Sequence, residues 1–169
     1  MRIDGIDKKI MSILINAAST SKAEIARRVG LAASVVSERI HRLEDAGIIK
    51  GYEARLDHRA LGMPLMAFIF VRERKPGIEF DTGAALSEVS GVEEVHKIAG
   101  DDCFLVKIRA PGTEELGVIL DTQIDTIPTV TGVRTTIVLK SVLESPPLSG
   151  LPEFAECVGQ GGPLITENL

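Results

Sequence analysis

The stretch AEIARRVGLAASVVSERIHRLEDAGIIKGYEARLD, residues 23–57, decides the fold of the N-terminal part of the chain. Its apolar residues recur at helical spacing, first over 21–29 and again from Ala33 to Ala46. Gly30 lies between the two segments and Gly47 follows the second, where a residue of positive φ commonly ends a helix. The pattern predicts two short helices joined by a sharp turn.

A further helix is predicted ahead of this pair. Residues 6–16 carry apolar side chains at helical spacing: Ile6, Ile10, Ile13 and Leu14. Asp4 or Asp7 can cap its start, and Ser21 with Glu24 has the spacing of a capping box for the second helix. Three helices with a tight turn between the last two form a helix-turn-helix, whose last helix enters the major groove of DNA. We therefore expect the recognition helix to run from about Ala33 to Ala46.

The charges divide unevenly along the chain. The formal net charge of the whole chain is −5. Residues 1–64 hold 11 Lys/Arg and 8 Asp/Glu, a charge of +3, whereas residues 65–169 hold 8 and 16, a charge of −8. A mildly basic module beside an acidic one is consistent with DNA binding by the first half alone.

Composition indicates a soluble, cytoplasmic chain. The hydrophobic content of 44% and charged content of 25% are ordinary for a globular protein. No stretch approaches the roughly 18 apolar residues of a membrane span, and the start Met1-Arg2-Ile3-Asp4 does not resemble a secretory signal. Two cysteines, Cys103 and Cys157, make no disulfide framework and are expected to be reduced thiols.

After Gly47 the pattern changes from helical to alternating. Residues 48–56 predict a strand or β-ribbon that leads out of the helical module, and 57–62 predict a turn or short helix. Pro64 makes a boundary plausible. We divide the chain into a helix-turn-helix domain at 1–50, a ribbon or linker at 51–64, a second domain at 65–143 and a Pro/Gly-rich C-terminal arm at 144–169.

The second domain alternates strands and helices. Strands are predicted at 65–71, 92–99, 103–109 and 132–139, and helices at 80–89 and 113–127. The order β-α-β-β-α-β is that of a ferredoxin-like fold, an antiparallel sheet with both helices on one face. The fold class is therefore α+β, a three-helix (winged) helix-turn-helix domain followed by a ferredoxin-like domain.

The other face of this sheet needs a cover. We expect Phe68, Phe70, Val106 and Ile108 to leave apolar groups there. An uncovered apolar sheet face predicts self-association.

The run at 23–57 resembles the DNA-binding half of the Lrp/AsnC family, the feast/famine regulators. The residues that carry the resemblance are Ile25-Ala26, Gly30-Leu31, Arg39-Ile40, Leu43-Glu44, Gly47-Ile48-Ile49 and Gly51-Tyr52. The second domain resembles the ligand-sensing domain of that family, with its mark at Ala99-Gly100-Asp101-Asp102-Cys103-Phe104-Leu105. The resemblance covers about residues 4–143.

The sequence departs from the family pattern at two places. The family usually has Ser after the Leu of the turn, as the N-cap of the recognition helix, whereas this chain has Ala32 followed by Ala33. We expect Ser34 to cap instead, so that the helix starts a residue or two late, since losing a good cap costs about 1 kcal/mol. Many members carry Asp where Cys103 stands, and a thiol there removes an acceptor for the amino group of a ligand.

A recognition helix presents short polar side chains from its first turns to base edges. The candidates on its solvent face are Ser34, Ser37, Glu38, His41 and Arg42. The serines can bond to a phosphate or a base edge, Glu38 can accept from cytosine N4, and Arg42 can reach phosphate or guanine. The alternative is a solvated helix face without a DNA contact.

Other basic residues have less direct roles. Lys22, Arg27 and Arg28 flank the second helix and can position the DNA backbone. Arg39 is expected to brace the module through a salt bridge with a carboxylate of its own domain. One module of charge +3 binds phosphates weakly, so we expect an oligomer to be the DNA-binding unit.

The resemblance implies an effector site. Family members bind small ligands, commonly amino acids, between dimers near the Gly-Asp loop. Carried over, the site is Gly100, Asp101, Asp102 and Cys103, with hydroxyl contacts from Thr135 and Thr136. Asp101 or Asp102 would hold an α-ammonium, and Gly100 would let a ligand approach. The alternative is a tight β-hairpin turn, for which Gly-Asp-Asp is an ordinary sequence.

The function expected on these grounds is that of a sequence-specific transcriptional regulator without a cofactor. Homodimers would form through the ribbon and the sheets and assemble further, for example to an octamer, with an amino acid bound between dimers. The alternative is an architectural protein that wraps DNA without a ligand.

An enzyme is not expected. The three histidines, His41, His58 and His96, have no zinc-site spacing with the cysteines. A Cys103–His96 dyad is geometrically conceivable on neighbouring strands, but a small buried thiol is the commoner outcome. A haem-precursor decarboxylase on the same fold is the enzyme alternative.

Overall fold

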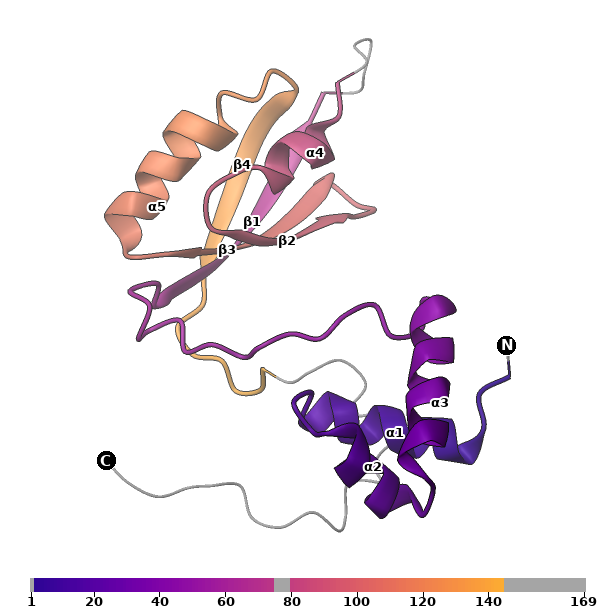
Figure 1. Ribbon diagram of the computed structural model, residues 1–169. Coiled ribbons are helices and arrows are strands. Elements are labelled where there is room, and N and C mark those ends of the chain that lie inside the picture. Colours follow the sequence, from indigo (N-terminus) through magenta and orange to yellow (C-terminus); the bar gives the residue numbers. More distant parts are fainter. Residues whose placement is uncertain (1, 75–79, 145–169) are drawn as a thin grey trace. The chain divides into compact units, whose positions relative to one another are not determined.

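The computed structural model describes residues 2–74 and 80–144, which divide into two compact units (Figure 1). The N-terminal unit ends at Arg55, and the second unit spans Leu56–Val142. This division lies within the predicted linker at 51–64. The predicted C-terminal arm at 144–169 lies outside the described residues, apart from Glu144.

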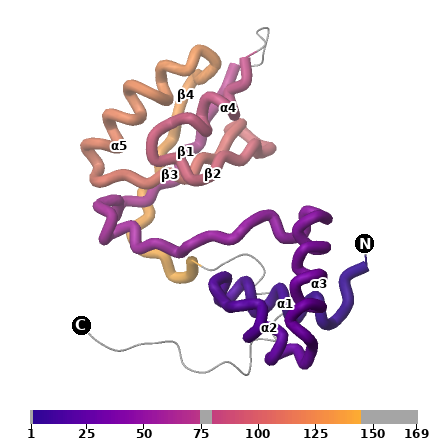
Figure 2. Tube along the Cα trace, in the orientation of Figure 1, coloured from indigo at the N-terminus to yellow at the C-terminus, as the bar shows by residue number. Residues whose placement is uncertain are grey.

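The N-terminal unit is a bundle of three helices, α1 (Gly5–Asn16), α2 (Lys22–Val29) and α3 (Ala33–Asp45), whose trace is followed in Figure 2. Its core is made of residues that repeat at helical spacing: Ile10, Leu14, Ile25, Ala26, Val36 and Ile40. Asp4 caps α1 by accepting from the Ile6 and Asp7 N–H groups, and the Asp7 side chain accepts from the Asp4 N–H in return. The predicted first helix and its cap are confirmed.

The second unit is an antiparallel sheet of four strands in the order β2-β3-β1-β4. Its elements follow one another as β1 (Leu65–Glu73), α4 (Thr82–Ser87), β2 (Val92–Lys97), β3 (Phe104–Ala110), α5 (Thr113–Ile119) with a π-helical turn (Leu120–Ile124), and β4 (Val130–Ile137). This order and topology confirm the predicted ferredoxin-like fold.

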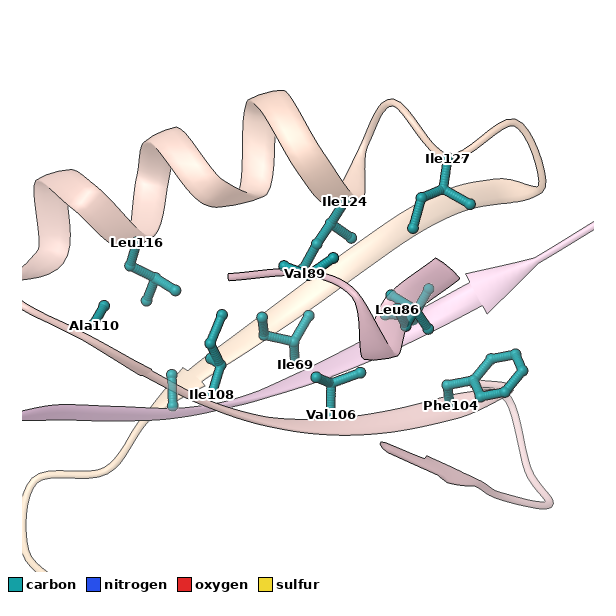
Figure 3. Packing of buried hydrophobic residues seen from close by; sticks show 12 residues of the cluster. Ile69, Leu86, Val89, Phe104, Val106, Ile108, Ala110, Leu116, Ile124 and Ile127 are labelled. Carbon is teal, nitrogen blue, oxygen red and sulfur yellow. The ribbon is translucent and has the colours of Figure 1, made fainter. Parts of the chain in front are cut away.

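The helices α4 and α5 cover one face of the sheet, and the core of the unit lies between them and the strands. Figure 3 shows Leu116 and Ile124 of the helical layer above Ile69, Val106 and Ile108 of the sheet. Because α4 and α5 bring their apolar residues to the same face, a single core is formed there.

The prediction for the opposite face is right at Phe68 and Phe70 and wrong at Val106 and Ile108. Both of the latter are fully buried in the core under the helices. The reason is the register of β1 with β3, which pairs Phe68 with Lys107 and Phe70 with Leu105. Even-numbered residues of β1 therefore share a face with odd-numbered residues of β3.

The alternating segment at 48–56 forms no strand, contrary to the prediction. Residues 51–57 are irregular, and none of the described strands pairs with them. A strand needs a neighbour to satisfy its backbone N–H and C=O groups, so alternation alone does not create one. The turn predicted at 57–62 is present, with the Asp57 carboxylate accepting from the Arg59 and Ala60 N–H groups and Gly62 at φ +75°.

Several element ends in the second unit differ from the prediction by about two residues, most clearly those of the helices and of the last strand. The first helix is shorter than 80–89 because Asp81 caps it at Thr82 by accepting from the Ala84 N–H. The second helix ends at Ile124 through the π-helical turn, before the predicted 127. The last strand begins at Val130, two residues earlier than predicted.

Candidate nucleic-acid interface and effector loop

The turn between α2 and α3 fixes where the recognition helix begins. Gly30 has φ +72°, and the Leu31 N–H donates to the Ala26 carbonyl over 3.0 Å. Leu31 packs against the core of the unit, which anchors the turn. A left-handed residue at this point is favourable for Gly because it has no Cβ to clash.

The expected late start of α3 at Ser34 is wrong. The helix begins at Ala33 with Ala32 as its N-cap, in extended conformation, and no side chain bonds to the first-turn N–H groups. The Val36 N–H already donates to the Ala32 carbonyl, so the turn sets the start of the helix without a cap. At the other end the Ile48 N–H bonds to the Leu43 carbonyl and the Gly47 N–H to the Glu44 carbonyl, which is a Schellman motif.

The exposed face of α3 presents the predicted polar residues together. Ser34, Glu38 and His41 are exposed and Ser37 is half-buried, at positions that share one helix face. Lys22, at the start of α2, donates from Nζ to Ser37 Oγ over 3.1 Å. Five of the six predicted DNA-binding residues therefore lie on one continuous surface of two adjacent helices.

Arg42, the sixth, is held by the protein itself. Its Nη2 donates to both carboxylate oxygens of Asp7 over 3.2 and 3.3 Å. Arg39 Nη1 donates to Asp4 and to Asp7, each over 2.7 Å, which confirms that Arg39 braces the module. Asp7 is completely buried, so two guanidinium groups of α3 are tied to one carboxylate of α1. Sequence reasoning recognised Asp7 only as a cap.

Arg27 and Arg28 are also paired, both with Glu24. Arg27 bonds to both oxygens of the Glu24 carboxylate and Arg28 to one, over 2.7 to 2.8 Å. These bonds, first from Arg27 and then from Arg28, lower the pKa of Glu24 to about 2. The predicted capping box is consequently half formed: the Ser21 hydroxyl accepts from the Glu24 N–H, but the Glu24 side chain is engaged elsewhere.

Tyr52 links the segment after α3 back to that helix. Its hydroxyl donates to Glu44 Oε1 over 2.7 Å. Burial and then this hydrogen bond raise the pKa of Tyr52 to about 12. The bond spans eight residues and crosses the end of the helix, so no local pattern in the sequence reveals it.

The predicted effector loop is the turn between β2 and β3. The Ile98 N–H donates to the Cys103 carbonyl and the Cys103 N–H to the Val71 carbonyl, over 2.9 and 2.8 Å. Gly100 has φ +148°, a conformation that side chains disfavour, and nothing lies within 4 Å of the position of a Cβ on it. The loop is therefore anchored at both ends and open at its tip.

The two aspartates of the loop differ. Asp101 is exposed, whereas Asp102 is nearly buried and bonds to Arg134 Nη2 over 2.9 Å and to Arg72 Nε over 3.3 Å. The hydrogen bond from Arg134, and then the interactions with Arg72, lower the pKa of Asp102 below its usual value, although burial acts in the opposite direction. The Arg134 guanidinium also stacks on the Phe70 ring, 3.8 Å from its centroid. Sequence reasoning missed both arginines, because they come from β1 and β4.

Of the remaining predicted effector residues, Cys103 and Thr135 lie on the core side of the sheet and Thr136 lies on the open face. Cys103 packs against the core under the helices, and Thr135 pairs with Ile69, which belongs to that core. Arg134 and Thr136 pair with Phe70 and Phe68 and so lie on the open face. The structure thus separates Thr135 from the arginine pair at Asp102.

The proposed Cys103–His96 dyad is not formed. His96 pairs with Leu105 on the open face, and its Nε2 is 3.0 Å from Glu94 Oε2. Cys103 points the other way, into the core. Within the described ranges 2–74 and 80–144, no three His, Cys, Asp or Glu side chains gather to hold a metal ion. In the same ranges no helix is long and apolar enough to cross a bilayer.

Each unit matches the model of a known protein family. Residues 3–50 match the model of a winged helix-turn-helix DNA-binding domain, and residues 66–148 match the Lrp/AsnC ligand binding domain. The HTH-type transcriptional regulator FL11 of Pyrococcus horikoshii is 41% identical over 143 residues, which are 85% of this chain and 93% of that protein. The leucine-responsive regulatory protein of Haemophilus influenzae is 30% identical over 145 residues, 85% of this chain and 87% of that protein.

A solved structure agrees with both matches. A feast or famine regulatory protein of M. tuberculosis, complexed with L-methionine, has a TM-score of 0.79 at 29% identity and covers 85% of this chain and 96% of its own. A helix-turn-helix unit joined to a ligand-binding unit defines a DNA-binding transcriptional regulator. The chain belongs to the Lrp/AsnC family of these regulators.

Proposed function

We propose that this regulator reads a specific DNA sequence with α3 and that an amino acid changes its assembly or its affinity for DNA. The observation that carries the first part is the exposed face of α3, where Ser34, Ser37 and Glu38 stand free of the core. These short side chains suit the base edges of the major groove. The ion pairs of Asp7 with Arg39 and Arg42 support the proposal because they hold α3 rigidly against α1.

The amino-acid effector is supported by the ligand-binding match and by the loop at 98–103. A relative of the same fold has been solved with L-methionine. We assign the α-ammonium of the effector to Asp101, because the Asp102 carboxylate already accepts from two guanidinium groups. Gly100, with no Cβ, leaves room for the ligand beside Asp101.

Assembly is proposed to use the open face of the sheet. Phe68, Phe70 and Leu105 are half-buried there, on the face of the sheet opposite α4 and α5. The irregular segment 51–57 is available to pair with the same segment of a second copy as a β-ribbon. Dimers formed in this way would assemble further, for example to an octamer, and several modules on one DNA raise the effective concentration of each.

An effector between dimers regulates by its differential affinity for two states of the assembly. A ligand that binds both states equally shifts nothing, so the response measures the difference between them. The assembled regulator would act in the cytoplasm, where it meets DNA.

A thermal-shift screen of the full chain against the twenty amino acids, with light scattering on each hit, tests the effector. We expect at least one amino acid to raise the melting temperature and to change the scattering mass. Asp101→Asn should abolish that shift and leave DNA binding without effector intact. Asp121→Asn, an exposed carboxylate in the helical layer, is the matched control and should keep the shift.

A second function is favoured by one observation. Cys103 bears no charge at the place where many members carry Asp, and Asp102 is engaged, so the loop offers one free carboxylate instead of two. An architectural protein that wraps DNA without a ligand fits this arrangement. No shift with any of the twenty amino acids, in a preparation that binds DNA, would favour it over the regulated form.

A further inference from the structure

The hydrogen bond between α2 and α3 on the DNA-facing surface has a fixed direction. Lys22 Nζ lies 3.1 Å from Ser37 Oγ. An ammonium group has three donors and no acceptor, so the Ser37 oxygen must be the acceptor in this bond. One of its two lone pairs is thereby used, and the hydroxyl hydrogen is directed away from Lys22.

The hydroxyl hydrogen of Ser37 has no partner within the described part of the protein. A serine inside a helix often donates to the carbonyl four residues earlier, which here belongs to Ala33. No such bond is formed, and the bond with Lys22 is the one that Ser37 makes among residues 2–74 and 80–144. Ser37 therefore presents a donor to whatever approaches the exposed face of α3.

The charge around this pair makes Lys22 unlike the arginines of the unit. Arg27 and Arg28 form ion pairs with Glu24, Arg39 with Asp4 and Asp7, and Arg42 with Asp7. Lys22 forms no ion pair with a carboxylate in the described ranges. Its positive charge is available to the DNA at the same place where it orients Ser37.

We propose that Lys22 is a specificity-determining residue that acts through Ser37. By accepting from Lys22, the hydroxyl is biased to donate to the DNA, and so to prefer a base with a major-groove acceptor. Guanine N7 or O6, adenine N7 and thymine O4 are such acceptors, whereas cytosine presents the N4 donor. Without Lys22 the hydroxyl rotates freely and reads donors and acceptors alike. The inference rests on the proposed function, in which α3 reads the major groove.

The test is to select binding sites from a pool of randomised duplexes with the full chain and with its variants. For the wild type we expect a motif in which one base position per half-site disfavours cytosine. Ser37→Ala should weaken that preference by about fivefold, which is the lower end of the discrimination of a good base contact. Lys22→Met should weaken the preference at the same position, and the double variant should lose no more than either single variant.

The alternative role for Lys22 is a phosphate contact alone. In that case Lys22→Met lowers the affinity for all duplexes alike and leaves the base preference unchanged, and this result would overturn the inference. Lys9→Met removes the same charge from the exposed side of α1 and should keep the full motif. Lys22→Arg, unlike Lys22→Met, keeps a donor and a charge at this position and should keep part of the preference against cytosine.

Failure of the inference is distinguishable from failure of the proposed function. A wild-type motif that Lys22→Met leaves intact contradicts the inference alone. A wild type that selects no motif, while it still binds DNA, contradicts sequence-specific reading and the inference with it. Circular dichroism and thermal unfolding check that each variant is folded. We expect them to be folded, because Lys22 and Ser37 do not contribute to the core.

Discussion

Asp7 is the residue that joins the capping of α1 to the placement of α3. It is completely buried, and its oxygens accept from the Asp4 N–H, from Arg39 and from Arg42. A buried carboxylate is costly unless its oxygens are hydrogen-bonded and its charge is paired, and both conditions are met here. The orientation of the recognition helix depends on this one side chain.

Replacing Asp7 by Ala should lower the free energy of unfolding by about 3 kcal/mol, because Arg39 loses a buried partner and α1 loses half of its capping box. Urea unfolding of the full chain measures the change in the N-terminal transition. Glu53→Gln, an exposed substitution after α3, should stay within about 0.5 kcal/mol of the wild type. A loss below about 1 kcal/mol for Asp7→Ala would show that the ion pairs of Asp7 with Arg39 and Arg42 do not stabilise the unit.

Asp4 predicts a pH dependence of the same unit. The hydrogen bond from the Asp7 N–H, and then that from Arg39, lower the pKa of Asp4 from 3.8 to about 2. A depressed carboxyl pKa contributes stability above the unfolded pKa, and this contribution is lost as the pH falls through the folded pKa. The difference in the free energy of unfolding between the wild type and Asp4→Asn should therefore be largest at pH 6 and shrink between about pH 4 and pH 2. Urea midpoints at these pH values measure it, and a difference independent of pH would contradict the ionic role of Asp4.

At the scale of elements, local residues predicted the helices of the N-terminal unit well. Asp4, Ser21, Gly30 and Gly47 each act on backbone groups within a few residues, so the sequence around them is enough to place helix ends. The predicted start of α3 at about Ala33 is confirmed, whereas the cap expected at Ser34 is absent, because the turn at Gly30 and the anchored Leu31 set the start without a side-chain cap.

The sheet was less predictable than the helices. Alternation shows that the residues of β3 face two sides, but the register with β1 decides which side Val106 takes. The partners of Asp102 could not be predicted for the same reason. Arg72 and Arg134 lie on two strands that are adjacent in the sheet and far apart in the sequence.

The missing cap of α3 gives a prediction for this element. Ala32 already has the extended conformation of an N-cap, so Ala32→Ser should add the side-chain bond without moving the backbone and stabilise the protein by about 1 kcal/mol. Ala33→Ser carries the same hydroxyl one residue later, inside the helix, and should give no gain. Thermal unfolding compares the two variants, and an equal effect of both would rule out capping as the cause.

At the scale of the whole molecule, the formal charge is divided unevenly along the chain. Residues 1–64 carry +3 and residues 65–169 carry −8. All four arginines of α2 and α3 form ion pairs with carboxylates of the N-terminal unit, which reduces the attraction of one copy to phosphates further. Tight DNA binding by such a chain needs several copies acting together, which the open sheet face is proposed to supply.

Phe68→Glu should disrupt the assembly and keep the fold. Phe68 lies half-buried on the open face, so a carboxylate there can stay hydrated in a single copy but is unfavourable in an apolar interface. Light scattering should give a smaller mass than for the wild type. Val118→Glu, on the exposed side of α5, should leave the mass unchanged. An unchanged mass for Phe68→Glu would exclude this face as the site of assembly.

The most direct test of the account is a comparison of DNA affinities. The affinities of the wild type and of the double variant Ser37→Ala/Glu38→Ala are measured for a duplex selected by the wild type and for a scrambled duplex of the same composition, at one salt concentration. We predict that the wild type prefers the selected duplex and that the variant, still folded and assembled, binds both equally. A variant that keeps the wild-type preference would show that the exposed face of α3 is not the surface that reads DNA.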